Sequence, residues 1–152
     1  MGGAGSCCLL LLCILFATTA CQAQPKVFIT TKGRGESAFE VEIADTPVKR
    51  ELGFQYRREL APNRGMIFLF PADGEHDFWM KNTPIPLDMI FISSDRKIVG
   101  IIEQAVPFSL ESRSVHTPSR FVLEINGGLS RRYGFKTGDS VRFEGISADV
   151  SE

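Results

Sequence analysis

The chain has 152 residues, of which 43% are hydrophobic and 23% charged, a composition typical of one folded globular domain. Its formal net charge is -1, and every charged side chain lies at or after Lys26. A nucleic-acid-binding surface normally carries a basic excess or a basic stripe, and this chain has neither. We therefore expect no nucleic-acid partner.

The N-terminal residues have the features of an export signal. Residues 7–17 form a short apolar run, and the small residues Thr18-Thr19-Ala20 follow it. The run is too short to span a bilayer comfortably and matches the apolar region of a secretory signal, although no Lys or Arg precedes it. We predict a signal peptide over residues 1–20 and an exported protein, located in the periplasm or anchored to the membrane of the bacterial envelope.

All four cysteines lie within the first 21 residues, so the rest of the chain has none for a disulfide or a cysteine zinc site. The segment 18–21 resembles a bacterial lipoprotein cleavage box, in which the cysteine becomes the lipid-modified first residue. Cys21 is thus a candidate lipid anchor, with residues 21–25 as a short tether. The alternative is ordinary cleavage after Ala20 or Ala23, which would release a soluble protein.

The first part of the expected domain reads as a β-hairpin. Residues 26–31 are rich in β-branched and aromatic side chains, and residues 38–44 alternate apolar with acidic. The second strand is expected to direct Phe39, Val41 and Ile43 inward. The glycine-rich turn 32–36 joins two strands and lacks the Lys-Ser/Thr ending of a phosphate loop, so it predicts no nucleotide cofactor.

Asp45-Thr46-Pro47 predicts the start of a helix, because Asp or Thr caps a helix well and proline is harmless in its first turn. The helix is expected to run to Tyr56 or Arg58, with Gly53 as its weakest position. Val48, Leu52 and Tyr56 fall on one face of it.

A buried strand is expected over residues 66–70, ended by Pro71, and an acidic loop over residues 72–77 follows it. The loop contains His76 among three acidic residues, which raises the question of a metal. Its spacing does not match a calcium loop, so we expect a solvated hairpin loop and no metal.

The stretch from Phe78 to Ile92 has the most unusual composition, because it places the only tryptophan, two prolines and two unlike charges in apolar surroundings. Residues 78–81 are expected to form a short strand, on which Lys81 shares a face with Trp79. A turn at Asn82-Thr83-Pro84 then leads to a strand over residues 87–92.

Asp88 lies near the start of that second strand, in otherwise apolar sequence, and a buried carboxylate there needs a partner. The nearest candidates are Lys81 and the backbone or side chains of Asn82 and Thr83. In a structural interpretation Asp88 closes the turn and Lys81 neutralises it. In a functional interpretation these groups line a pocket floored by Trp79.

The last part of the chain predicts strands over residues 97–105, 120–126 and 140–144 and a short helix over residues 129–133, with a tail after residue 146. Glu124 interrupts its strand as Asp88 interrupts the earlier one. Residues 106–119 show no periodicity. A loop of this length is often functional, so it is a candidate lid or rim, or else a surface excursion.

Together these elements predict one α+β domain, mainly β, over residues 26–146. We expect a strongly bent sheet or partial β-barrel of six to eight strands, covered by two short helices. The strand order cannot be derived from the pattern.

Four motifs carry a resemblance to a known family: Glu51-Leu52-Gly53-Phe54, Gly65 to Phe70, Phe78 to Thr83 with Leu87-Asp88, and Leu123-Glu124 followed by Gly127 and residues 134–139. Over about residues 38 to 145 the chain resembles the bacterial and archaeal family known as domain of unknown function 192. Phe54-Gln55 stands where that family is expected to carry Leu-Met. The resemblance implies a small, mainly β domain, often exported, and supplies no reaction and no catalytic residue.

We expect a binding or accessory module of the cell envelope rather than an enzyme. Its ligand would be a small molecule, glycan fragment or peptide held around Trp79, Lys81, Asn82, Thr83, Asp88 and Glu124, because an aromatic platform with a few polar groups is typical of such pockets. The alternative is a hydrolase or lyase with Asp88 and Glu124 as paired carboxylates and Lys81 stabilising negative charge. A third possibility is a structural or assembly role.

Overall fold

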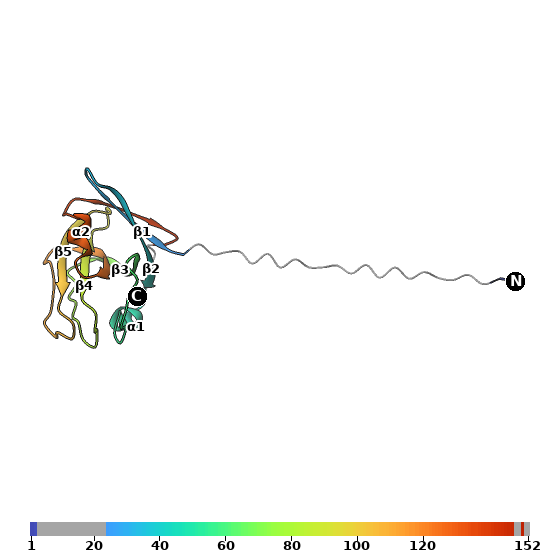
Figure 1. Cartoon of the computed structure of the whole chain (residues 1–152), viewed down its shortest axis with the longest axis horizontal. Helices are drawn as coiled ribbons and strands as arrows, with labels where there is room; N and C mark the ends of the chain where they lie inside the picture. Colours follow the sequence, from blue (N-terminus) through green and yellow to red (C-terminus); the bar gives the residue numbers. More distant parts are fainter. Residues whose placement is uncertain (3–23, 148–149, 151–152) are drawn as a thin grey trace.

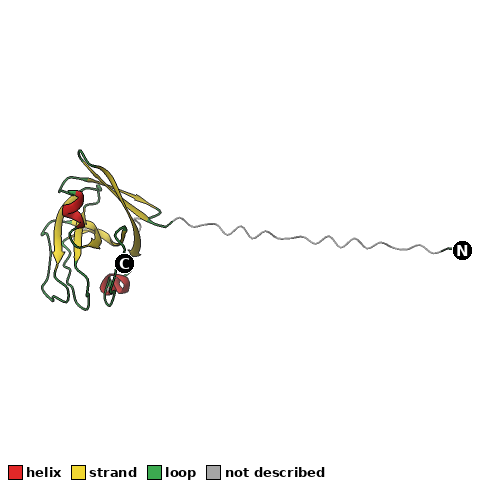
Figure 2. Cartoon of the chain, in the orientation of Figure 1, coloured by secondary structure: helices red, strands yellow, loops and turns green. Residues whose placement is uncertain are grey.

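The computed structural model describes residues 1–2, 24–147 and 150, and it arranges them as one curled sheet with two short helices (Figures 1 and 2). The strands and helices in chain order are β1 (Lys26–Thr31), β2 (Gly35–Ala44), α1 (Pro47–Leu52), β3 (Arg64–Gly74), β4 (Leu87–Ile92), β5 (Ile98–Ala105), β6 (Ser119–Asn126), α2 (Leu129–Tyr133) and β7 (Ser140–Glu144). The predicted fold class, α+β and mainly β, is confirmed.

The sheet has the strand order β5-β4-β6-β3-β2-β1-β7, and every pair is antiparallel except β2 with β3. Its two edges meet at one end, where the Ile98 N–H donates to the Asp139 carbonyl at 3.0 Å and the Val141 N–H donates to the Arg96 carbonyl at 2.9 Å. A bridge between Lys97 and Ser140 lies between these bonds. The sheet is therefore a partial barrel, as predicted.

Alternation along the strands gives the sheet an apolar cluster on each face. On β6, Leu123 and Ile125 belong to the cluster inside the barrel, whereas Val122 belongs to the cluster outside it. The outer cluster is covered by Phe54, which follows α1, and by Met80 from the segment between β3 and β4. This outer layer of helix and loops leaves room for a pocket on the convex side of the sheet.

The first hairpin and the helix start follow the prediction. Phe39 and Val41 are buried in the inner cluster, and Ile43 packs against it. Thr46 caps α1, because its side chain accepts a hydrogen bond from the Lys49 N–H at 3.3 Å.

The predicted helix length was wrong. The helix α1 ends at Leu52 rather than at Tyr56 or Arg58, because Gly53 adopts φ 47° and ψ -134°, a conformation outside the helical region. Its apolar face is also exposed, with 52% of Leu52 accessible to solvent.

Two strand predictions need correction. The segment 78–81 is not a strand, since only Phe78 forms a bridge, to Arg113. The strand β3 continues through Pro71 to Gly74. Its pairing with β6 is interrupted between Leu69 and Gly74, so Pro71, which has no N–H, is not required to donate a hydrogen bond to β6.

The predictions of a signal peptide over residues 1–20 and of a lipid anchor at Cys21 fall almost wholly on residues outside the described part of the chain, as does most of the predicted tail. Among the residues that the structure describes, neither helix has the length and apolar content to cross a bilayer.

Candidate functional site

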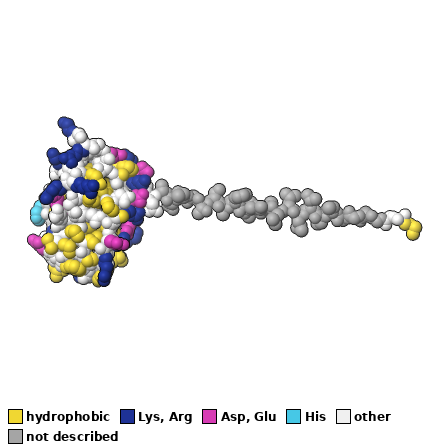
Figure 3. Space-filling view, viewed as in Figure 1, with side chains coloured by type: hydrophobic (Ala, Val, Ile, Leu, Met, Phe, Trp, Pro, Cys, Tyr) yellow, Lys and Arg dark blue, Asp and Glu magenta, His cyan; other side chains and the backbone are white. Residues whose placement is uncertain are grey.

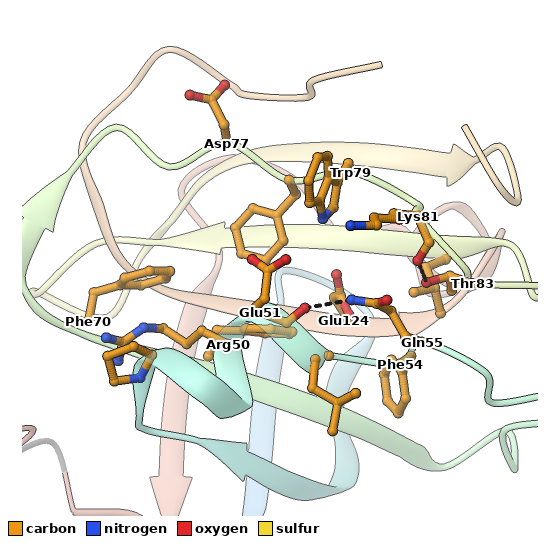
Figure 4. A pocket seen from close by; sticks show the side chains of 16 residues that line it. Arg50, Glu51, Phe54, Gln55, Phe70, Asp77, Trp79, Lys81, Thr83 and Glu124 are labelled. Atoms are coloured by element: carbon orange, nitrogen blue, oxygen red, sulfur yellow. Dashed lines mark hydrogen bonds between the residues drawn. The ribbon is translucent and has the colours of Figure 1, made fainter. Parts of the chain in front are cut away.

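A pocket of about 300 Å³ lies on the outer face of the sheet, between α1 with the turn after it and the segment 77–83 (Figure 4). Its walls are aromatic and come from three parts of the chain: Phe54, Phe68, Phe70, Phe78 and Trp79. The charged residues that line it are Arg50, Glu51, Asp77, Lys81 and Glu124. The pocket therefore combines aromatic walls, which are typical of small-molecule sites, with an unusually large share of charged and polar groups.

The inner wall is held rigid by packing between aromatic rings. Phe78 meets Phe68 edge to face at 5.1 Å between ring centroids, and it meets Phe91 in the same way at 5.8 Å. Phe78 is thus fixed between strands β3 and β4, although its own segment is not a strand. Trp79, the next residue, lies at the mouth with 44% of its surface exposed.

Glu124 forms the base of the pocket. On β6 it pairs with Met66 of β3 and Met89 of β4, so its side chain points to the outer face, where those methionines are buried. Only 4% of Glu124 is exposed, and its carboxyl has no hydrogen bond or ion pair within the described residues. Burial alone raises the pKa of this carboxyl to about 8, because the charged form loses its hydration and gains no partner.

Lys81 lies at the mouth, on the same side as Trp79. Its ammonium nitrogen is 4.9 Å from the centre of the tryptophan ring, a cation–π distance. The prediction that the two side chains share a face is confirmed. Thr83 lines the pocket below them, and its hydroxyl donates to the Lys81 carbonyl at 3.1 Å, which fixes the turn.

Arg50 closes the opposite side and ties α1 to the sheet. Its guanidinium donates to the carbonyls of Asp45 at 3.1 Å and Leu69 at 2.8 Å, and it lies 5.2 Å from the Phe70 ring. With these contacts Arg50 is held away from Glu124 as a structural cation. Glu51, on the same helix, points toward the pocket in Figure 4.

Asn82 acts outside the pocket, as a connector. Its side-chain N–H groups donate to Gln55 Oε1 at 3.0 Å and to the Tyr56 hydroxyl at 2.9 Å, and its carbonyl accepts from the Tyr56 N–H at 2.7 Å. It therefore joins the turn after α1 to the segment that carries Trp79 and Lys81.

Asp88 lies on the other face of the sheet and is fully buried. Its carboxylate accepts three backbone hydrogen bonds, from the N–H groups of Gln104 at 2.8 Å, Gly128 at 2.8 Å and Ser130 at 2.7 Å. Two of these donors belong to the start of α2, which has no side-chain cap of its own. The predicted partners of Asp88, which were Lys81, Asn82 and Thr83, were therefore wrong.

The paired-carboxylate hypothesis fails for the same geometric reason. Asp88 pairs with Ile125 and shares its inner face, whereas Glu124 pairs with Met89 and faces outward. Neighbouring residues of a strand point to opposite faces, so the sheet separates the two carboxyls. A hydrolase or lyase that uses both cannot be built on this site.

The sequence profile of one family, described as DUF192 (uncharacterized ACR, COG1430), matches residues 27–143, which is nearly all of the folded part. The chain belongs to the DUF192 family. This confirms the resemblance carried by the four motifs.

Curated relatives and solved structures resemble the chain, and their descriptions name no reaction. A UPF0127 protein of Pyrococcus abyssi is 28% identical, over 68% of this chain and 86% of its own length. A UPF0127 protein of Pyrococcus furiosus is 26% identical, over 74% of this chain and 93% of its own length. A protein of unknown function from Novosphingobium aromaticivorans matches with a TM-score of 0.74 and 41% identity, over 77% of this chain and 83% of its own. A Sinorhizobium meliloti protein described as a candidate transcription regulator matches with a TM-score of 0.78 and 40% identity, over 82% and 97%.

In this DUF192 chain the acidic segment 72–77, which spans the end of β3 and the loop after it, is largely solvated, with Asp73, Glu75 and Asp77 exposed. His76 instead stacks on Phe70 with 3.5 Å between ring centroids, and its Nε2 lies 2.9 Å from the Ser119 carbonyl. Burial lowers the pKa of His76. Across residues 24–147, no three His, Cys, Asp or Glu side chains gather as metal ligands would.

The loop between β5 and β6 forms hydrogen bonds with the segment 78–83. Its Phe108 N–H donates to the Thr83 carbonyl at 3.1 Å, and its Ser109 carbonyl accepts from the Met80 N–H at 2.9 Å. Ser112 of the same loop lines a second hollow beside Trp79. The loop therefore fixes the segment 78–83 and extends the rim on the Trp79 side.

Several large hydrophobic side chains are exposed on the domain. They gather at the lower end of the domain in Figure 3, the end where Figure 1 shows α1. The exposed residues from α1, the segment 78–83 and the loop after β5 are Val48, Leu52, Trp79, Val106, Phe108 and Leu110. Of these residues, Leu52 and Trp79 also line the pocket.

Sequence reasoning missed the wall that follows α1. Phe54 and Gln55 both line the pocket, and these are the two positions where the chain differs from the Leu-Met expected for the family. That difference from the family was the one signal in the sequence for this wall. It could not be connected with the site without the structure, in which the chain turns at Gly53 and brings these residues to the sheet.

Proposed function

We propose that this DUF192 chain is a binding or accessory module of the cell envelope, and that its ligand enters the pocket between Trp79, Lys81 and Glu124. One observation carries the proposal. Glu124 is buried at the base of a pocket, and no group among the described residues satisfies its carboxyl.

A buried polar group without a hydrogen bond costs free energy, on the order of 1 to 3 kcal/mol in proteins. Leucine or methionine at position 124 would complete the outer cluster beside Met66 and Met89 without that cost. A purely structural role therefore does not explain the carboxyl, whereas a ligand that bonds to it does. The aromatic walls offer the same ligand an apolar contact surface.

Thermal unfolding of the purified protein tests the proposal, with a panel of glycan fragments, peptides, amines, organic acids and nucleotides. A ligand at about 100 times its dissociation constant stabilises the native state by about 2.7 kcal/mol. We expect a shift for at least one class, a changed shift for Lys81→Ala and none for Glu124→Gln. Trp79, the only tryptophan, gives a fluorescence signal from the pocket itself.

The matched control is Lys32→Ala. Lys32 is exposed in the turn between β1 and β2, at the opposite end of the domain from α1 (Figure 1). A shift that survives Glu124→Gln unchanged, or is lost equally in Lys32→Ala, would contradict a binding site at this pocket.

We also propose that the chain is exported, with Cys21 as its lipid anchor. The apolar run at residues 7–17 and the small residues before Cys21 support this. Metabolic labelling with a radioactive fatty acid, followed by cell fractionation, tests it against Cys21→Ala. Label lost in Cys21→Ala supports the anchor, unlabelled protein in the periplasm indicates ordinary cleavage, and cytoplasmic protein contradicts export.

A further inference from the structure

The Glu124 carboxyl lacks a counter-ion, and aromatic rings surround the space in front of it. From this we infer that the pocket takes an organic cation, whose ammonium group pairs with the Glu124 carboxylate between the rings of Phe68, Phe78 and Trp79. This inference rests on the proposed function and names its ligand class.

Three of the five aromatic rings that line the pocket already contact a cationic side chain of the protein. Lys81 lies 4.9 Å from the centroid of the Trp79 ring. Arg57 lies 5.5 Å from that of Phe54, and Arg50 lies 5.2 Å from that of Phe70. Rings attract cations within about 6 Å. Among the described residues, no cation lies over Phe68 or Phe78, the two rings of the inner wall.

The other charges in the pocket leave none to neutralise Glu124 when it is ionised. Glu51 from α1 and Lys81 from the segment before β4 point into the pocket in Figure 4, and their opposite charges cancel, whereas Arg50 and Asp77 line the pocket but point away from Glu124. Arg50 is committed to two backbone carbonyls, and the Lys81 ammonium lies over Trp79. When Glu124 ionises, the pocket therefore has one uncompensated negative charge, which a ligand with a single ammonium group neutralises.

Binding of such a ligand is coupled to the loss of a proton. In the free protein burial keeps the Glu124 carboxyl protonated near neutral pH, since its pKa is about 8. The ammonium pairs with the carboxylate, so the carboxyl proton passes to the buffer while the ligand keeps its own protons. At pH 7 about nine-tenths of a proton leaves per ligand bound. A neutral ligand that accepts a hydrogen bond from the protonated carboxyl releases none.

Calorimetric titration of the purified protein distinguishes these cases. The probes are n-butylammonium and its uncharged and anionic counterparts, n-butanol and butyrate, each in two buffers that differ in ionisation enthalpy. We expect butylammonium to bind best and to release close to one proton at pH 7. Its affinity is expected to fall about tenfold for each pH unit below about 8, while the probe itself stays charged.

A free amine and a lysine side chain of a peptide offer the same ammonium group. Nα-acetyl-lysine amide, compared with Nα-acetyl-norleucine amide, separates the two sources. Stronger binding of the blocked lysine than of butylammonium indicates a peptide ligand, and the reverse indicates a small amine. Either result supports the cation inference, provided that the norleucine compound binds weakly.

Glu124→Gln keeps the shape of the side chain and is expected to lose the preference for butylammonium over butanol and its pH dependence, while circular dichroism confirms that it is folded. Glu59→Gln, at an exposed glutamate, is the matched control. Equal binding of butanol without proton release, or an unchanged preference in Glu124→Gln, overturns the cation inference and leaves the binding site standing. If no compound of any class binds or changes Trp79 fluorescence, the proposed function fails as well.

Discussion

Asp88 and Glu124 are both buried carboxyls on adjacent strands, yet their surroundings differ completely. Asp88 accepts three backbone hydrogen bonds on the inner face of the sheet, whereas Glu124 on the outer face has no partner within the described residues. The first arrangement stabilises the fold, because the N–H groups at the start of α2 need an acceptor. The second destabilises it. Asp88 therefore has a structural role, and we propose Glu124 as the group available for function.

The difference also explains why one carboxyl cannot take over the role of the other. Asp88 joins three parts of the chain, since its donors lie on β5, before α2 and within α2. Glu124 joins none, and it borders a pocket instead. Substitutions at the two positions should therefore change stability in opposite directions, and the predictions below test this from the largest expected effect to the smallest.

The largest effect is expected for Asp88→Ala. It leaves three backbone N–H groups without their acceptor, and the one on Ser130 is fully buried. At about 1 to 3 kcal/mol for each buried donor and less for a part-buried one, we expect the free energy of unfolding to fall by on the order of 3 to 6 kcal/mol. Urea denaturation measures the loss. Asp88→Asn keeps one acceptor oxygen and should lose less. A change under about 1 kcal/mol in Asp88→Ala would show that Asp88 is not the structural member of the pair.

Glu124→Gln is expected to have the opposite sign. The pKa of Glu124 is 4.5 in the unfolded chain and about 8 in the folded one, so the folded state holds a proton that the unfolded state has lost. The contribution of Glu124 to stability therefore falls as pH rises from about 4.5 to 8 and changes no further above that. At pH 9 we expect the variant to be more stable by at most about 5 kcal/mol, at 1.36 kcal/mol per pKa unit.

The measurement is denaturant unfolding at pH 5, 7 and 9, with Glu59→Gln as the control. The advantage of Glu124→Gln over the natural protein should be small at pH 5 and grow with pH. An advantage independent of pH would mean that the carboxyl is not held neutral by burial.

Gly53→Ala tests the wall that faces Glu124. Gly53 has a positive φ that other residues rarely adopt, and an added Cβ would lie 3.4 Å from the Phe68 ring. We expect a loss of about 1 to 3 kcal/mol in thermal or urea unfolding, together with weaker ligand binding, because the turn that brings Phe54 and Gln55 to the pocket shifts. Unchanged binding would show that this wall does not contact the ligand.

Lys81→Ala should change stability least. Lys81 is exposed, and within residues 24–147 its ammonium contacts the Trp79 ring alone, an interaction of about 0.5 to 1 kcal/mol at exposed sites. We expect a melting temperature close to that of the natural protein, and an altered Trp79 fluorescence spectrum. A large loss of stability would make Lys81 a structural residue, which is one of the two interpretations that its sequence context allows.

Local chemistry made much of the fold predictable. The β-branched strands β1 and β4, the short helix α2 and the cap of α1 at Thr46 follow from residues close together in sequence. The errors lie where non-local contacts override the local pattern. Residues 78–81 have strand composition, but their ring contacts with Phe68 and Phe91 hold Phe78 outside the sheet.

The sequence by itself determined the family, the mainly β composition, the first hairpin and the presence of two carboxylates in apolar strands. Only the tertiary structure decided what those carboxylates do. The strand order places Asp88 and Glu124 on neighbouring strands, and their register turns one inward to the α2 backbone and the other outward to the pocket. Side chains alternate along each strand, so a shift of one residue in pairing would exchange their faces. That register depends on contacts between distant segments, and no local pattern encodes it.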